Sequence, residues 1–170
     1  MSELQSALDA LAAEDVRTLA PRRQLDEIAQ LIEARNRIDA QLARRVRAAE
    51  LSQAAEDDGL KSMQAWLRGH GRLSPASAVR VVRNGRALDH LPVLAAAFAE
   101  GAVTAEQVGV VAPVVTEDRR TAALAQGIDL DEVDRTLTAV AVECPIQQLA
   151  QVVHHYLSRL DPDGPEPDPT

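Results

Sequence analysis

Hydrophobic residues recur along this chain at intervals of three and four, the spacing that places side chains on one face of an α-helix. Proline suits the first turn of a helix because its missing amide has no partner there, and Pro21 opens the longest such stripe. The stripe consists of Leu25, Ile28, Leu31, Ile32, Ile38, Leu42 and Val46. It predicts one long helix from about Pro21 to about Ala55, followed by a loop at residues 56–59.

This stripe has two structural interpretations. A near-heptad repeat can form the contact face of a coiled coil with another chain. However, Arg35 interrupts the repeat and the run is short. We therefore favour packing of the stripe inside a single helical bundle.

Start and stop signals divide the remaining chain into shorter helices, because serine and threonine cap helix starts and glycine permits the left-handed backbone that ends them. Thr104 and Gln107 have the spacing of a capping box. The expected helices run from Ser2 until Glu14, from Ser62 until Gly69, from Ser74 through about Leu88, from Pro92 until Gly101, from Thr104 to Val115, from about Glu117 to Gln126, from about Asp131 to Glu143, and from Pro145 to about Leu160. We expect Trp66 and Phe98 in the core.

The helix after Ser74 separates apolar from basic positions. On a helical wheel its apolar side gathers Ala78, Val79, Val81, Val82 and Leu88. Arg80 and Arg83 point away from that side and Arg86 lies at its flank. We expect these three arginines to be exposed to solvent.

Composition agrees with a helical fold. Apolar residues make up 46% of the 170 residues and aromatic residues only 2%, so helix-forming alanine and leucine carry much of the core. We predict one all-α, multi-helix domain over residues 1–160 with one long N-terminal helix. Residues 161–170 alternate proline with acidic residues and are predicted to be a linker or tail. The chain has no membrane-length apolar run and no signal-like start, so we expect a cytoplasmic protein without a membrane partner.

Charge is distributed unevenly. The net charge is −8, yet residues 61–90 hold six basic residues against one acidic residue. Exposed cations favour contact with nucleic-acid phosphates. The candidate DNA-phosphate contacts are Arg68, Arg72, Arg80, Arg83 and Arg86. A helix-turn-helix interpretation of residues 91–115 is less favoured. Its second helix offers only Glu106 and Gln107 as polar side chains and has no arginine or lysine to contact DNA.

A series of short motifs follows in a fixed order along the chain. The motifs are Trp66-Leu67, Leu73-Ser74-Pro75-Ala76-Ser77-Ala78, Leu88, Leu91-Pro92, Ala97-Phe98, Gly101, Val103-Thr104, Gln107-Val108 and Leu160-Asp161-Pro162-Asp163-Gly164. In this order they resemble the signature of the 13E12-repeat family, domain of unknown function 222 (DUF222), over about residues 20–164. In actinobacteria this helical region often precedes an HNH endonuclease domain.

The resemblance implies an accessory role instead of a catalytic one, because no histidine here has the setting of an HNH motif: His70, His90, His154 and His155 stand apart from it. Adjacent helical residues such as His154 and His155 do not share a face, so we do not expect them to bind a metal ion together. We expect no cofactor, and the sequence identifies no small-molecule ligand. The expected function is a non-catalytic, DNA-associated module. The alternative is a protein-interaction or dimerisation module whose long helix pairs with a nuclease domain or a second copy.

Overall fold

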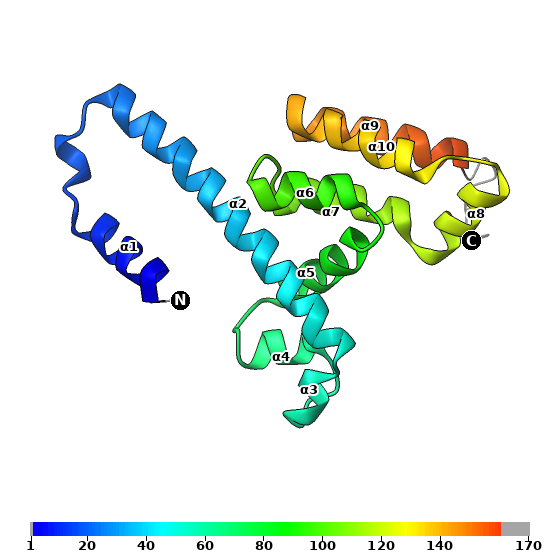
Figure 1. Ribbon diagram of the computed structural model, residues 1–170, viewed down its shortest axis with the longest axis horizontal. Coiled ribbons are helices and arrows are strands. Elements are labelled where there is room, and N and C mark those ends of the chain that lie inside the picture. Colours follow the sequence, from blue (N-terminus) through cyan, green and yellow to red (C-terminus); the bar gives the residue numbers. More distant parts are fainter. Residues whose placement is uncertain (1, 161–170) are drawn as a thin grey trace, which may run out of the picture.

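The structure, a computed structural model, describes residues 2–160, which fold into ten α-helices and two short 3-10 helices without a β-strand (Figure 1). This confirms the predicted all-α fold with one long N-terminal helix. The predicted tail at residues 161–170, with most of the last family landmark, lies outside the described residues. No helix among the described residues is both long and apolar enough to cross a membrane.

Most helices begin where the capping residues predicted. The side chains of Ser62, Ser74 and Thr104 each accept a backbone amide hydrogen bond, and Gln107 completes the capping box. The α-helices are α1 Ser2–Ala13, α2 Pro21–Leu51, α3 Ala54–Asp57, α4 Met63–Gly69, α5 Pro75–Leu88, α6 Pro92–Glu100, α7 Ala105–Val111, α8 Glu117–Ala125, α9 Leu130–Glu143 and α10 Ile146–Leu160. The 3-10 helices are η1 Val16–Thr18 and η2 Ala112–Val115.

Two predicted helices are shorter than expected. The long helix α2 ends at Leu51 instead of near Ala55, because Gln53 adopts a left-handed backbone (φ 56°) that turns the chain into α3. The turn has a packing consequence, since it buries Ala55 in a small apolar cluster. The helix expected to reach Val115 ends as α7 at Val111, where Pro113, which has no amide to donate, begins a tighter 3-10 turn.

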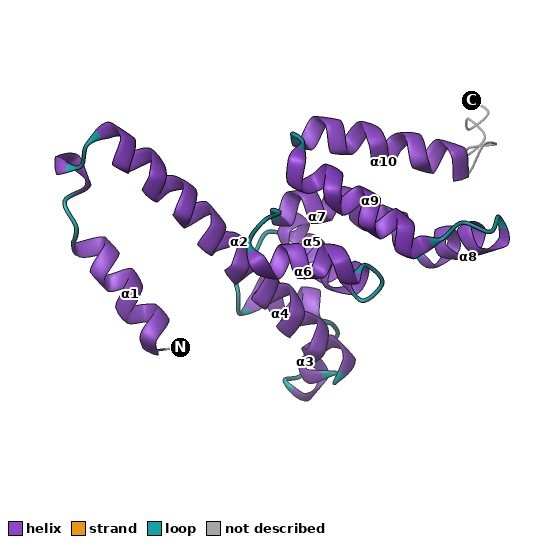
Figure 2. Ribbon diagram, turned by 45° about the horizontal axis from the view of Figure 1, so that its top comes forward, coloured by secondary structure: helices purple, strands orange, loops and turns teal. Residues whose placement is uncertain are grey.

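The main core lies between the C-terminal half of α2 and the later helices. Phe98, predicted as a core residue, is 1% exposed and packs with Leu94, Leu137 and Leu149 from α6, α9 and α10. Figure 2 shows α9 and α10 running side by side on the far side of α6 and α7 from α2. We call these helices the body of the domain. Helix α5 packs with its inner face against α2 and α7, and its outer face stays exposed.

A second, smaller cluster joins the end of α2 to α3, α4 and α5. Trp66, expected in the core, lies only partly buried at the edge of this cluster. Its indole N–H donates to Asp58 (2.9 Å) and its ring stacks on His70, which keeps the polar end of the indole at the surface. Val79 was also expected on the packed side of its helix but is 48% exposed.

A buried carboxylate connects two helices of the main core. Asp134 on α9 is 1% exposed, and its two oxygens accept the backbone amides of Val93 (2.7 Å) and Leu94 (3.1 Å) in the first turn of α6. Thr138 donates a third hydrogen bond to it (3.2 Å). Leu91, at the capping position, offers no side-chain acceptor, so Asp134 caps α6 from another helix.

The beginning of the chain packs differently from the rest. We call α1 together with residues 21–35 of α2 the N-terminal arm. No residue of α1 is buried, and the first buried residue of α2 is Asn36. Figure 1 shows the arm extending away from the body. The expectation that the long apolar stripe packs inside one bundle is therefore wrong for most of the stripe: of its members only Val46 is buried, and Leu25 through Leu42 are exposed.

Candidate functional site

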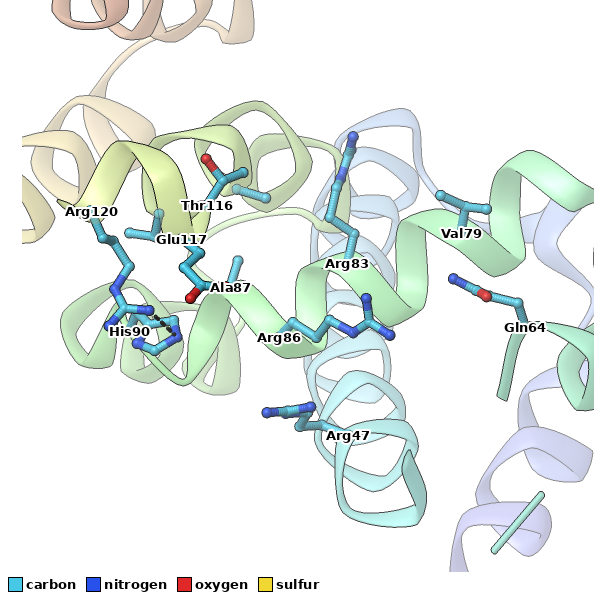
Figure 3. Close-up of a pocket in the computed structure, with 12 residues that line it drawn as sticks. Arg47, Gln64, Val79, Arg83, Arg86, Ala87, His90, Thr116, Glu117 and Arg120 are labelled. Atoms are coloured by element: carbon cyan, nitrogen blue, oxygen red, sulfur yellow. Dashed lines mark hydrogen bonds between the residues drawn. The ribbon is translucent and has the colours of Figure 1, made fainter. Parts of the chain in front are cut away.

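A groove of about 560 Å³ opens beside the exposed face of α5. Its walls come from α5, η2 and the start of α8, with one side chain each from α2 and α4 (Figure 3). The lining residues are Arg47, Gln64, Val79, Arg83, Arg86, Ala87, His90, Ala112, Val115, Thr116, Glu117 and Arg120. Four arginines against one carboxylate make the lining basic.

The position of α5 is fixed by its opposite face. Asn84 is buried and its amide donates to the carbonyl of Ala105 on α7 (2.9 Å). Gly85 lies so close to α2 that a Cβ added to it would sit 2.9 Å from the backbone oxygen of Ala43. These contacts press α5 onto α2 and α7, and consequently Arg83 and Arg86 are left on the groove side.

Arg86 belongs to an ion-pair network. Its Nε lies 3.0 Å from both carboxylate oxygens of Glu50, whose side chain is 19% exposed. Arg47 also pairs with Glu50 (2.8 Å) and with Asp89 (2.6 Å). The hydrogen bond from Arg86, followed by that from Arg47, lowers the pKa of Glu50 below its ordinary value. In this network two guanidinium groups are matched by two carboxylates.

Arg83 and Arg120 have no carboxylate within ion-pair distance among the described residues. Arg83 donates to the backbone carbonyl of Gly109 (3.3 Å). Arg120 contacts Nε2 of His90 (3.1 Å), and because a guanidinium can only donate, the imidazole must accept there. Burial and then the charge of Arg120 lower the pKa of His90, which favours its neutral form. These two arginines keep uncompensated positive charge at the groove.

The five arginines predicted as DNA contacts are all exposed but do not form one set. Arg83 and Arg86 line the groove, whereas Arg80, Arg72 and Arg68 lie outside its lining. Arg72 has a left-handed backbone (φ 55°) in the turn between α4 and α5. We therefore place Arg83 and Arg86, but not the other three, at the candidate site.

Two further cations of the groove were not found from the sequence. Arg47 lies on α2 and Arg120 on α8, far from α5 along the chain. No local pattern marks either residue, because only the packing of α2 and η2 against α5 brings them to the same surface.

The groove has the chemistry of an anion site. Guanidinium groups present several N–H donors in a fixed plane, which suits the oxygens of a phosphate or carboxylate. Within the described residues no group of three or more histidine, cysteine, aspartate or glutamate side chains could hold a metal ion.

Comparison with known families identifies the chain. A family model described as "Domain of unknown function (DUF222)" matches residues 23–169. The chain belongs to the DUF222 family. Comparisons with curated proteins and with solved structures give no match. The family resemblance read from the motifs is thus confirmed, and any function for this DUF222 chain must be argued from its own surface.

Proposed function

We propose that this DUF222 domain is a non-catalytic helical accessory module that binds DNA phosphates through the arginine groove. The observation that carries the proposal is the pair Arg83 and Arg120, which have no carboxylate partner among residues 2–160 and line one concave, basic surface. Phosphate contacts dominate the affinity of proteins for DNA and require exposed cations. We propose that the module positions or regulates a nuclease domain supplied elsewhere, and that it does so in the cytoplasm.

The surroundings of the groove limit what such binding can be. The chain carries a net charge of −8, so electrostatic attraction to DNA has to come from local groups of exposed cations, such as the one at this groove. The groove lining contains no phenylalanine, tyrosine or tryptophan on which a base could stack, and the imidazole of its His90 contacts Arg120. We therefore expect contacts to the DNA backbone with little sequence preference.

Fluorescence anisotropy of a labelled DNA duplex, titrated at several salt concentrations, tests the proposal. Each phosphate contact contributes about 0.9 to the slope of log affinity against log salt. Arg83→Ala and Arg120→Ala should each weaken binding and reduce that slope by about one contact. Arg135→Ala is the matched control, because Arg135 is equally cationic but pairs with Glu132 on α9, away from the groove. Equal affinities for all three variants would exclude the groove.

A second candidate function is protein interaction or dimerisation through the long helix. It is favoured by the exposure of Ile28, Leu31, Ile38 and Leu42, whose exposed fractions range from 40% to 53%. Contiguous exposed apolar side chains of this size mark surfaces that another protein covers. Light scattering across a wide dilution range tests this candidate, because self-association predicts a mass that rises with concentration.

A further inference from the structure

The N-terminal arm presents two apolar faces that the described part of the chain leaves uncovered. On α1 these are Leu4, Leu8 and Leu11, which are 38% to 49% exposed. On α2 the matching set is Leu25, Ile28 and Ile32, which are 43% to 68% exposed. An isolated helix of 12 residues is only marginally stable in water. Helix α1 therefore needs a surface to pack against.

The two faces match each other in an antiparallel register. The leucines of α1 are spaced by four and then three residues, and the apolar residues of α2 by three and then four. When the two helices lie antiparallel, each of the three leucines of α1 faces one of the three apolar residues of α2, which gives three layers. These layers pair Leu11 with Leu25, Leu8 with Ile28, and Leu4 with Ile32. Facing apolar layers at alternating three- and four-residue spacing are the packing unit of coiled-coil helices.

Charge is compatible with this register. The positions that flank the layers are uncharged, and alanine at Ala7, Ala12 and Ala29 allows the helices to approach closely. The acidic side chains of these two helical segments all lie on the side of their helix that points away from the layers. They are Glu3, Asp9, Asp26, Glu27 and Glu33. No two like charges are therefore brought face to face, although both helices are acidic there.

The connection between the helices directs α1 away from its own α2. The side-chain amide of Gln24 donates to the carbonyls of Val16 (3.2 Å) and Leu19 (3.1 Å), which fastens η1 to the first turn of α2. Asp15 caps η1 and pairs with Arg17. With this connection α1 stands apart from α2, as both Figure 1 and Figure 2 show.

We propose that two copies of this chain exchange their α1 helices. The α1 helix of each copy lies antiparallel on Leu25, Ile28 and Ile32 of the partner's α2, which is an isologous two-fold arrangement. Leu31, Ile38 and Leu42 lie roughly a quarter turn further round α2 and face the partner's α2. The inference gives a geometry to the self-association candidate, rests on that candidate, and is independent of DNA binding by the groove.

The contacting segment is large enough for a stable dimer. Helix α1 contributes 12 residues and a comparable stretch of α2 lies opposite it. Stable protein interfaces engage roughly 20–30 residues on each side. Two-fold exchange forms the α1–α2 layers twice, so every large apolar side chain of the arm gains a partner.

Disulfide trapping distinguishes exchange from closure within one chain. In a Cys144→Ser background, which removes the chain's single cysteine, Leu8→Cys and Ile28→Cys are combined and oxidised. Exchange predicts a covalent dimer on a non-reducing gel, and mixing the two single variants should give a covalent heterodimer. A covalent monomer from the double variant would mean that α1 folds onto its own α2, which overturns the proposal. Leu8→Cys with Gln30→Cys is the control, because position 30 lies on the outer face of α2 in this register.

Light scattering then separates failure of the exchange from failure of self-association. Exchange predicts that the wild-type dimer becomes monomeric in Leu8→Lys while the melting temperature of the body is unchanged. A dimer that survives Leu8→Lys but is lost in Ile38→Lys would overturn α1 exchange and leave dimerisation through α2 in place. A wild-type chain that is monomeric at every concentration would overturn both.

Discussion

Arg86 and Glu50 lie 36 residues apart in the chain and form an ion pair that joins α5 to α2. Because Glu50 also binds Arg47, this one carboxylate neutralises charge on two arginines of the groove. The pair therefore stabilises the packing of two helices and at the same time lowers the positive potential of the candidate site. A change at Glu50 should therefore affect the stability of the fold and the affinity for DNA in opposite directions.

Replacing the Glu50 carboxylate should strengthen DNA binding while weakening the fold. Glu50→Gln keeps the side-chain size but releases the charge of Arg86 and Arg47 toward the groove. We expect an increase in duplex affinity with a steeper salt dependence, and a loss of about 1 kcal/mol in the free energy of unfolding. Anisotropy and urea titration measure the two quantities. A decrease in affinity in a fully folded variant would argue against DNA in this groove.

The same carboxylate gives the fold a defined pH dependence. The pKa of Glu50 is lowered in the folded state, chiefly by the hydrogen bond from Arg86, relative to an ordinary value of 4.5. Its contribution to stability is therefore fully present above about pH 4.5 and is lost as the pH falls through the folded-state pKa. We expect the stability difference between wild type and Glu50→Gln to be constant from pH 7 to pH 5 and to shrink below that range. Urea titrations at a series of pH values test this.

His90 should make anion binding depend on pH in the opposite sense to stability. Its pKa is lowered from 6.5, first by burial and then by Arg120, with Arg47 adding to this and Asp89 opposing it. Below pH 6.5 the unfolded chain binds a proton at His90 more readily than the folded chain does. The free energy of unfolding is therefore unaffected by His90 above pH 6.5 and falls as the pH drops from there toward the folded-state pKa. A bound phosphate favours the protonated imidazole, so DNA affinity should rise over that same pH range. His90→Gln should remove this rise; an identical pH profile in that variant would show that His90 does not face the bound anion.

The helices of this fold could be predicted because their signals are local. Proline at position 21 and serine at positions 62 and 74 act within one turn of the chain, and the structure places helix starts beside each of them. The left-handed turn at Gln53 could not be predicted in this way, since glutamine carries no preference for it. It forms because the body offers a place to bury Ala55.

The candidate site was only partly predictable. A helical wheel identified the exposed arginines of α5, including Arg83, because exposure follows from the position of the buried face of the same helix. The residues that surround these arginines could not be predicted. Glu50, Arg47 and Arg120 reach the groove through contacts between helices, and single-sequence periodicity contains no information on which helices meet. The same limit explains why the stripe on α2 was expected to pack inside the bundle.

Gly85 shows a tertiary requirement that overrides helix propensity. Alanine is favoured over glycine inside a helix by roughly 1 kcal/mol. Here the added Cβ would lie 2.9 Å from the backbone oxygen of Ala43 and 3.2 Å from Cβ of Arg47, so α5 would have to move away from α2. We expect Gly85→Ala to destabilise the fold by about 1–3 kcal/mol in urea titration, as overpacking does. Gly69→Ala is the control, because no atom lies within 4 Å of a Cβ added at Gly69, so the change should be neutral or stabilising.

The buried carboxylate of Asp134 provides the most demanding test of the core. Asp134→Ala would leave the amides of Val93 and Leu94 without acceptors in a region closed to water. Loss of a helix cap costs about 0.5–2 kcal/mol, and leaving buried donors unsatisfied adds about 1–3 kcal/mol. We therefore expect a loss of roughly 2–4 kcal/mol in urea titration. Asp134→Asn, which keeps one acceptor oxygen, should lose less, and Asp131→Ala, at an exposed position on the same helix, should change stability by no more than about 0.5 kcal/mol. Equal losses in Asp134→Ala and Asp134→Asn would mean that the negative charge, acting on the dipole of α6, matters more than the number of hydrogen bonds.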